Sequence, residues 1–507
     1  MGIRLTGRRL LLAGILLLAA FAAAHAGQRA RARPSGAARS TVRAAARRSV
    51  PGNDWTRFGY DAQRSGVGPA DTGITAANVR SLRLRTVHLD GTVDAAPVEL
   101  HAVTVRGRRH DVIILTTTYG RTIALDAGTG GRLWEYTPPG IGGYSGSYEV
   151  TTATPVIDPD RRYVYAPSPD GLIHKLAIAT GREVRAGHWP VRITFLPSRE
   201  KITAALNVSG SSVVATTGGY LGDAPPYQGH LVMIDRASGR ITHVFNTLCS
   251  NRPNLIGAPS SCPVSDSAIV SRAGAVIEPG SGRILIATGN APFNGSTDWG
   301  DSVLELSRDG GRLLGHWTPT DQAELNDTDT DLGSSSPALL PGGLAVQGGK
   351  DGILHLIDVN RLEGTGRSAG SRLGGELQDL AGPGSAQVFT QPVVWTRGAR
   401  TSVFVADTGG TAAYVLGGDR RLHRAWSTGT AGTSPVLAGG LLYVFDPDGG
   451  RLDVYDPVTG RLRASLPAAP GHWNSPIVAG GRVILPVGSY LTHATSGTLE
   501  LYHLPGR

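Results

Sequence analysis

Residues Gly120 to Trp134 have the sequence GRTIALDAGTGGRLW. An apolar strand with alternating side chains runs into Asp126, turns through Ala-Gly-Thr-Gly and leaves as a second strand that ends at Trp134. An Asp side chain can accept hydrogen bonds from backbone amides two residues further on, and Gly130 supplies the positive φ that a short loop needs. The stretch therefore predicts a β-hairpin.

The same unit occurs eight times along the chain. Between the glycines that open successive units the spacing ranges from 40 to 71 residues, which is typical of four-stranded blades repeated around a ring. We therefore predict an all-β chain that forms an eight-bladed β-propeller of four-stranded antiparallel blades. The later copies open at Gly171, Gly229, Gly300, Gly352, Gly410, Gly450 and Gly497.

The two ends of the repeat region complement each other. Only four residues follow His503, so the last unit lacks a fourth strand, whereas the strand-like stretch 82–89 has no unit of its own. Pairing the two would close the ring and remove exposed sheet edges, which are the weak point of open sheets. We expect residues 51–507 to be one domain, closed by this N-terminal strand.

The positive charge of the chain is confined to its first fifty residues. The chain has a net charge of +9, but residues 1–50 contain ten arginines and no acidic residue, so residues 51–507 carry a net charge of −1. Binding to a nucleic-acid backbone requires clustered cations on the folded surface. The composition therefore argues against a nucleic-acid partner.

The N-terminus has the pattern of an export signal. Arg4, Arg8 and Arg9 precede an apolar run, and Ala24-His25-Ala26 offers a cleavage site before Gly27. We predict a signal peptide over 1–26 and a disordered Arg/Ala-rich spacer over 27–50. The protein is then exported as a monomer to the periplasm, the cell surface or the medium, with membrane contact only through the leader. An uncleaved leader that acts as an anchor is the alternative.

The repeat resembles a known family. The turn Asp-x-x-Thr-Gly-x-x-x-Trp, as in Asp126 to Trp134, resembles the repeat of the quinoprotein propellers. That family includes the alcohol dehydrogenases that depend on pyrroloquinoline quinone (PQQ) and the scaffold propeller of the outer-membrane barrel assembly machinery. The resemblance covers 51–507; it implies the fold and says little about function.

Part of the chain resembles the PQQ dehydrogenases more closely. In those enzymes the asparagine of Gly-Asn-x-Pro binds the calcium that holds the quinone, an Asp is the catalytic base, and a Lys or Arg contacts the quinone oxygens. By position the resemblance implies a metal and cofactor role for Asn290, a catalytic role for Asp329 or Asp331, a metal role for Asp329, and quinone contact for Lys350. The runs concerned are Ala287-Thr-Gly-Asn290-Ala-Pro292, Trp299-Gly-Asp301, Trp317-Thr-Pro, Asp329-Thr-Asp331 and Gly349-Lys350-Asp351-Gly352.

The chain also departs from that family at several places. Where the resemblance leads us to expect a calcium-binding Glu, the chain has Ser168-Pro-Asp170, so the ligand is lost or replaced by Asp170. The aromatic floor beneath the quinone is replaced by Val270, and there is neither an adjacent Cys pair nor a Cys-x-x-Cys-His haem motif. Turn chemistry alone also explains an Asn or Asp in a loop.

These observations support three functions. The first is a binding or scaffold module with a degenerate cofactor site, whose partner is a protein, a glycan or a small molecule. The second is a dehydrogenase of alcohols or sugars that uses PQQ and calcium. The third is a propeller that binds carbohydrate or cell wall through stacking tryptophans; the candidates are Trp189, Trp299, Trp317 and Trp473.

Cys249 and Cys262 are the only cysteines of the chain. In an exported protein this spacing predicts a disulfide, and two buried thiols are the alternative. The bridge should contribute about 3 kcal/mol by restricting the unfolded chain. We expect thiol titration of the unfolded, non-reduced protein to find no free thiol; two reactive thiols would contradict the prediction.

Overall fold

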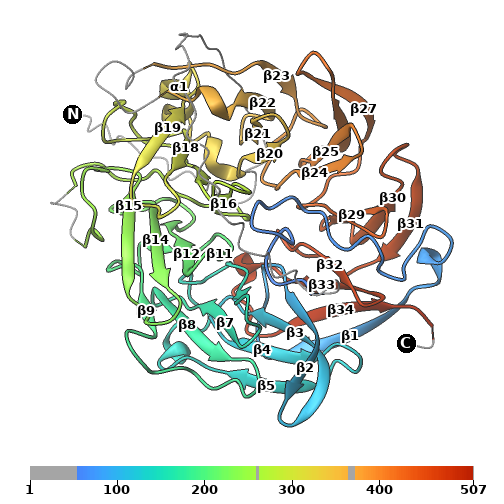
Figure 1. The fold of residues 1–507 in the computed structure, drawn as a ribbon. Coiled ribbons are helices and arrows are strands. Elements are labelled where there is room, and N and C mark those ends of the chain that lie inside the picture. The colour runs from blue at the N-terminus through green and yellow to red at the C-terminus, as the bar shows by residue number, and fades with distance from the viewer. Residues whose placement is uncertain (1–53, 258–261, 364–371, 506–507) are drawn as a thin grey trace, which may run out of the picture.

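The computed structural model describes residues 54–257, 262–363 and 372–505. Eight four-stranded sheets, each with its strands paired antiparallel, follow one another around a ring, as the progression of colour in Figure 1 shows. The predicted eight-bladed propeller is confirmed. The predicted signal peptide (1–26) and spacer (27–50) lie outside the described residues. Within the described residues, no helix is long and apolar enough to cross a membrane.

Blades one to four take up the first half of the ring, each with its strands in chain order from the first to the fourth. Their strands are β2 (Val98–Val105), β3 (Arg108–Thr116), β4 (Thr122–Asp126) and β5 (Arg132–Tyr136); β6 (Val156–Ile157), β7 (Tyr163–Pro167), β8 (Leu172–Ala177) and β9 (Val191–Arg192); β11 (Asn207–Ser209), β12 (Ser212–Thr216), β14 (His230–Asp235) and β15 (Ile241–Asn246); and β16 (Val276–Ile277), β17 (Ile284–Ala287), β18 (Val303–Leu306) and β19 (Leu313–Trp317).

Blades five to eight complete the ring, and the last takes one strand from the N-terminus. Their strands are β20 (Ala338–Leu340), β21 (Leu344–Gly348), β22 (Ile353–Asp358) and β23 (Gln378–Ala381); β24 (Val393–Arg397), β25 (Arg400–Ala406), β26 (Thr411–Leu416) and β27 (Leu422–Thr428); β28 (Val436–Ala438), β29 (Leu441–Asp446), β30 (Arg451–Tyr455) and β31 (Leu462–Pro467); and β32 (Ile477–Ala479), β33 (Arg482–Val487), β34 (Gly497–His503) and β1 (Arg83–Leu89).

Few elements lie outside the blades. A two-stranded sheet joins the loop before blade three to a loop within it. The remaining elements are β10 (Glu200–Lys201), β13 (Gly218–Gly219), α1 (Gln322–Asp327) and the 3-10 turns η1 (Val79–Ser81), η2 (Ile141–Gly143), η4 (Leu332–Ser334), η5 (Val359–Arg361) and η6 (Tyr490–Thr492).

The hairpin turn has the predicted mechanism. The amides of Gly128 and Thr129 donate to Asp126 Oδ1 at 3.0 and 2.7 Å, and Gly130 has a φ of 75°. A Cβ on Gly130 would lie 2.5 Å from Val87 Cγ2 in β1. The glycine therefore serves both the turn and the contact with the neighbouring blade.

Tryptophans connect consecutive blades. The Trp134 indole at the end of blade one donates to the carbonyl oxygen of Ile178 in blade two at 2.7 Å. A Cβ on Gly181 would lie 2.7 Å from the Trp134 ring, so the glycine lets the indole pack directly on the turn. Trp426 of blade six packs on Gly460 of blade seven in the same way.

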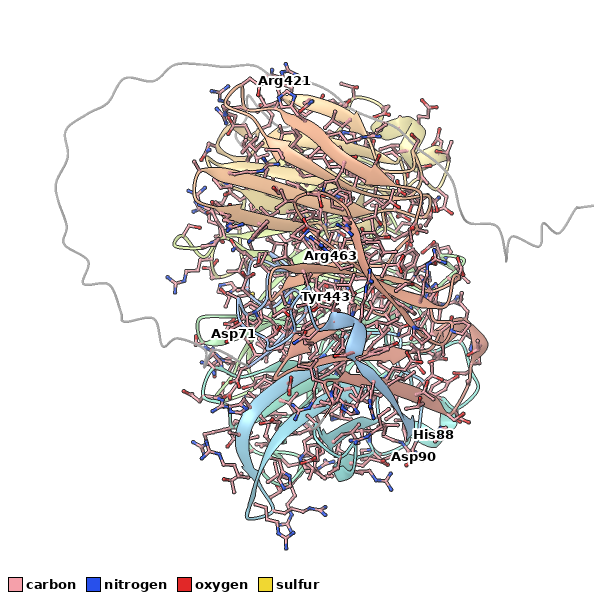
Figure 2. All side chains as sticks on the ribbon, turned by 90° about the vertical axis from the view of Figure 1, so that its right-hand side faces the viewer. Asp71, His88, Asp90, Arg421, Tyr443 and Arg463 are labelled. Atoms are coloured by element: carbon pink, nitrogen blue, oxygen red, sulfur yellow. A yellow bond between two sulfur atoms is a disulfide. The ribbon has the colours of Figure 1, made fainter. Side chains whose placement is uncertain are left out.

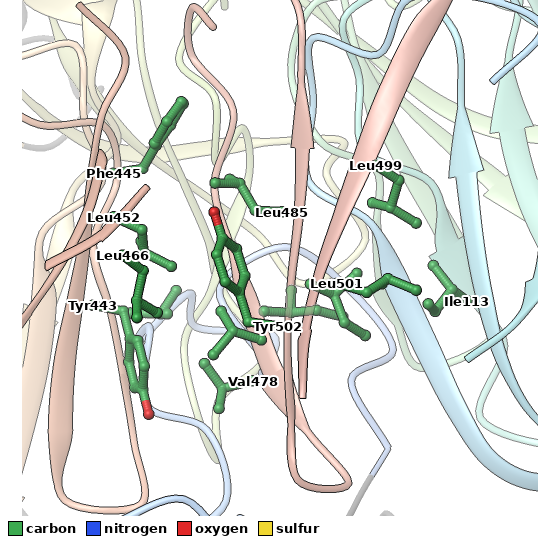
Figure 3. Close-up of a cluster of buried hydrophobic side chains, with 14 of the residues drawn as sticks. Ile113, Tyr443, Phe445, Leu452, Leu466, Val478, Leu485, Leu499, Leu501 and Tyr502 are labelled. Atoms are coloured by element: carbon green, nitrogen blue, oxygen red, sulfur yellow. The ribbon is translucent and has the colours of Figure 1, made fainter. Parts of the chain in front are cut away.

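The N-terminal strand closes the ring as predicted. β1 pairs antiparallel with β34 from Arg83 opposite His503 to Leu89 opposite Gly497. One apolar cluster spans blades seven, eight and one: Figure 3 shows Tyr502 of blade eight between Tyr443 of blade seven and Ile113 of blade one.

Seen from the side, the molecule is a thick disc with Arg421 near one edge and Asp90 near the opposite edge (Figure 2).

Closure should determine stability. Deleting residues 1–89 removes β1 and exposes edges on both sides of the gap, so we expect aggregation or non-cooperative thermal unfolding. Deleting residues 1–50 leaves every described strand in place and should shift the melting temperature little. Circular dichroism melts and size-exclusion chromatography compare the two truncations; equal stability would contradict N-terminal closure.

Candidate functional site

Loops from different blades meet at one end of the ring axis. In an antiparallel blade, the start of the first strand and the end of the second strand lie at the same end of the sheet. Asn290 follows β17, the second strand of blade four, and Lys350 follows β21, the second strand of blade five. Asp329 and Asp331 lie between them in the segment that leads to β20. We call this end of the axis the channel mouth.

Lys350 is held by the acidic segment. Its Nζ lies 2.6 Å from Asp329 Oδ1, 2.7 Å from Asp331 Oδ2 and 2.7 Å from the backbone oxygen of Asp329. A lysine ammonium has three N–H groups, so each has an acceptor. Burial opposes the charge, but Asp331 and Asp329 raise the pKa of Lys350 above its ordinary value. Lys350 is therefore a charged residue with no spare donor.

Asp331 links blades four and five. Its Oδ1 accepts a hydrogen bond from the amide of Asn290 at 3.1 Å, while its Oδ2 faces Lys350. A Cβ on Gly289 would lie 2.1 Å from Asp331 Oδ1, so only glycine permits this approach. The side-chain amide of Asn290 makes no hydrogen bond to the residues that the structure describes. Among the described residues, the side-chain polar atoms of Asn290 are therefore without a hydrogen bond.

Three further carboxyl groups surround Asp331, and sequence reasoning missed them as site residues. Burial, followed by the charge of Asp331, raises the pKa of Asp223 to about 7. The same two causes raise the pKa of Asp301 well above its ordinary value. Burial is also the main cause that raises the pKa of Asp266, and the charge of Asp331 raises it further. Lys350 is the cation among these carboxyl groups, so this half of the mouth is acidic.

The backbone of the acidic half is strained. Residues other than glycine rarely adopt a positive backbone φ, and those that do are concentrated at functional sites. Five residues of this region have one, although nothing in their sequence marks them as strained. The φ angles are 41° at Asp223, 92° at Asp266, 57° at Ser267, 46° at Asp301 and 54° at Asp329.

Asp170, the predicted substitute for a calcium ligand, lies apart from this group. Its carboxylate accepts from the hydroxyl of Ser168, which also lies 2.7 Å from His174 Nε2 within blade two. No hydrogen bond or ion pair joins Asp170 to Asn290 or to the acidic segment in the described residues. Across the same residues, no three His, Cys, Asp or Glu side chains form a group that could hold a metal ion.

The place predicted for the cofactor floor is aliphatic. Val270 Cγ1 lies 2.4 Å from where a Cβ on Gly218 would stand, so Val270 packs against that glycine. The Asn290 amide and nearby carboxylates have the chemistry of a calcium site. The valine and the occupied ammonium of Lys350 do not suit a flat, anionic quinone.

The predicted bridge between Cys249 and Cys262 is present and therefore confirmed.

Comparisons with known proteins show what this propeller is similar to. A family model described as outer membrane protein assembly factor BamB matches residues 60–245. Quinohemoprotein alcohol dehydrogenase ADH IIB of Pseudomonas putida is 24% identical over 341 residues, which are 61% of this chain. The match spans 46% of that relative, about half of its length.

Solved structures agree on the fold. A quinohemoprotein alcohol dehydrogenase from Comamonas testosteroni is 16% identical, with a TM-score of 0.62, and the match covers 91% of this chain and 82% of that one. A europium-containing methanol dehydrogenase is 14% identical, with a TM-score of 0.64, and the match covers 90% of this chain and 98% of that one. BamB from Moraxella catarrhalis is 14% identical, with a TM-score of 0.51, and the match covers 84% of this chain and 99% of that one. The resemblance to the quinoprotein-like propeller repeat family is confirmed.

Replacing Lys350 tests the acidic half. Lys350→Met leaves Asp329 and Asp331 without their cation, and we expect a loss of about 2 kcal/mol at pH 8, below the ~3–5 kcal/mol of a fully buried pair because Asp329 is half exposed. Lys350 lowers the pKa values of Asp223 and Asp301, so without it their folded-state pKa values rise further and the deficit should shrink as the pH falls from 8 to 5.

Denaturant unfolding at the two pH values measures this difference. Lys350→Arg keeps the charge and is the matched control, so its loss should be smaller. If Lys350→Met and Lys350→Arg lose the same stability at both pH values, the charge of Lys350 does not stabilise the acidic half.

Proposed function

We propose that the protein is an exported binding module: a PQQ-type propeller whose channel mouth binds a partner or ligand, with a cofactor site too altered for dehydrogenase chemistry. The observation that carries this proposal is the full use of Lys350. Its three N–H groups bond to Asp329 and Asp331, so contact with a quinone would require breaking one of these bonds. A lysine in this state stabilises a loop.

Two features of the site support weak cofactor binding. Val270 offers an aliphatic surface where a quinone would need an aromatic one, which reduces the stacking contact. Asp170, which would have supplied a charge for the metal, bonds to Ser168 in blade two instead. Calcium affinity depends on the number of charged ligands and on the rigidity of the site. Asn290 and the nearby carboxylates would therefore bind calcium weakly.

A PQQ- and calcium-dependent dehydrogenase is the second candidate. The contact of Asp331 with both Asn290 and Lys350 favours it, because the residues that the resemblance names meet in space. The relative in Pseudomonas putida is named as an alcohol dehydrogenase. In this reading Asn290 would hold the metal, and Asp331 would accept the proton of an alcohol.

Carbohydrate binding through tryptophan has weaker support. Of the four tryptophans considered as stacking platforms, Trp189, Trp299 and Trp317 are buried in the blades. Trp473 is partly buried and packs on Phe389, with the ring centroids 4.7 Å apart. A sugar would therefore find little indole surface on these four residues.

Export is part of the proposal. A disulfide forms and persists in oxidising compartments, and Cys249 and Cys262 are bridged. The leader over 1–26 has the pattern of a signal peptide. A secreted, periplasmic or cell-surface location agrees with both observations.

Titration with PQQ and calcium distinguishes the first two candidates. We expect weak or no PQQ binding by the full chain, and no reduction of an artificial electron acceptor with simple alcohols. Any residual activity should require calcium and should disappear in Asn290→Ala and Lys350→Ala. Tight PQQ binding with robust turnover would overturn the binding-module proposal in favour of the dehydrogenase.

A further inference from the structure

Lysine is rare in this chain, and each lysine is buried. Of 49 basic residues only Lys175, Lys201 and Lys350 are lysines, with exposed fractions of 6, 4 and 9%. Lys175 donates to the backbone oxygen of Arg236, and Lys350 has its three acceptors. The Nζ of Lys201 makes no hydrogen bond or ion pair with the described residues, and its contact is with the face of the Tyr490 ring.

Lys201 lies at the channel mouth. It precedes β11 of blade three, and its Nζ lies 3.9 Å from the ring centroid of Tyr490, which follows β33 of blade eight. Beside it, Arg272 precedes β16 of blade four and donates to the backbone oxygen of Asp94, which precedes β2 of blade one, at 3.3 Å. Groups from blades one, three, four and eight can meet only on the axis of the ring.

The carboxylate nearest to Lys201 is already in use. Asp94 Oδ2 accepts from the amide of Tyr490 at 3.0 Å and lies 2.8 Å from His472 Nδ1, while Asp94 Oδ1 faces Arg272 at 3.4 Å. Despite burial, His472 and Arg272 hold the pKa of Asp94 below its ordinary value. Burial first, and then Arg272, lower the pKa of Lys201 to about 7. This basic half of the mouth therefore lacks one anion.

We propose that Lys201 and Arg272 bind the carboxylate of a small ligand whose flat apolar body lies against Tyr490. Arg272 uses two of its five N–H donors on Asp94 within the described residues, so its fork has donors left for a carboxylate. The Lys201 ammonium contacts the Tyr490 ring but makes no hydrogen bond with the described residues, so its N–H donors can bond to a carboxylate. Tyr490 packs against a buried cluster that includes Tyr119 and Tyr220.

The carboxylate subsite goes beyond the proposed function, because it assigns a ligand class to the basic half of the mouth. It also stands apart from the cofactor question. The carboxylate subsite involves Lys201 and Arg272, whereas PQQ and calcium binding is tested at Asn290 and Lys350. Either one can fail while the other holds.

Lysine labelling gives the first test. The neutral amine of a lysine attacks an acylating reagent and displaces its leaving group, so a low pKa favours labelling of Lys201. With the full chain at pH 7.5, mass spectrometry should find Lys201 labelled faster than Lys175 and Lys350. Saturating benzoate should slow Lys201 labelling at least tenfold and leave Lys175 unchanged. Labelling of Lys201 that is slow, or that benzoate leaves unchanged, would overturn the proposal.

Calorimetry gives the second test, with benzoate as the probe and benzamide as its neutral counterpart. Benzoate should bind and benzamide should not. Lys201→Met should weaken benzoate binding at least tenfold, Lys201→Arg should retain it, and Lys175→Met is the matched control that changes nothing. Normal binding by a folded Lys201→Met variant would overturn the proposal. Inorganic phosphate that binds as tightly as benzoate would overturn the assignment to carboxylates.

The pH dependence has a definite sign. A bound carboxylate favours the ammonium form, so the pKa of Lys201 rises on binding, and affinity is full below pH 7 and falls above it. The other charged or titratable groups that face Lys201 are Arg272, Asp94, Asp223 and Tyr490, and His472 contacts Asp94. Lys201→Arg should remove the fall between pH 7 and 9; a fall that persists in this variant would assign it to another group.

Discussion

The contact between a large apolar side chain and the turn glycine of the next blade sets how neighbouring blades pack, and at several junctions that side chain is a tryptophan. Trp134 is 2% exposed, and burying an indole of roughly 200 Å² contributes about 5 kcal/mol of transfer free energy. Its ring packs on Gly181, and its N–H bonds to the carbonyl of Ile178. Contact and bond together fix how far one blade is rotated from its neighbour, and Trp426 on Gly460 repeats this.

Ring closure uses the same contact in a reduced form. Val87 of β1 packs on Gly130 where an indole would otherwise lie. β1 lies far from β34 in sequence but pairs with it over seven residues. The hydrogen bonds of this ladder compensate for the smaller packing contact of the valine. With the ring closed by β1, the loops at the axis can include the positive φ of Asp329 and the buried Lys201.

Sequence reasoning succeeded where the determinants are local. The turn at Asp126 follows from an Asp and a Gly four residues apart, so it could be predicted from one repeat. Asn290, Asp331 and Lys350 come from neighbouring blades, and a resemblance that named them sufficed to bring them together. The ion pairs of Lys350 with Asp329 and Asp331 could not be predicted, because they depend on the left-handed backbone at Asp329, which no sequence pattern indicates.

The groups that the sequence did not mark depend on contacts across the axis. Asp223 and Lys201 belong to ordinary loop segments, and only the meeting of several blades gives each a pKa near 7. Burial and then the charge of Asp331 raise the pKa of Asp223 on the acidic side, and the charge of Asp223 in turn favours the ammonium form of Lys201 on the basic side. A cation bound beside Asp331 would favour ionised Asp223 and so keep Lys201 charged. The charge of Asp223 therefore couples the two halves of the mouth electrostatically.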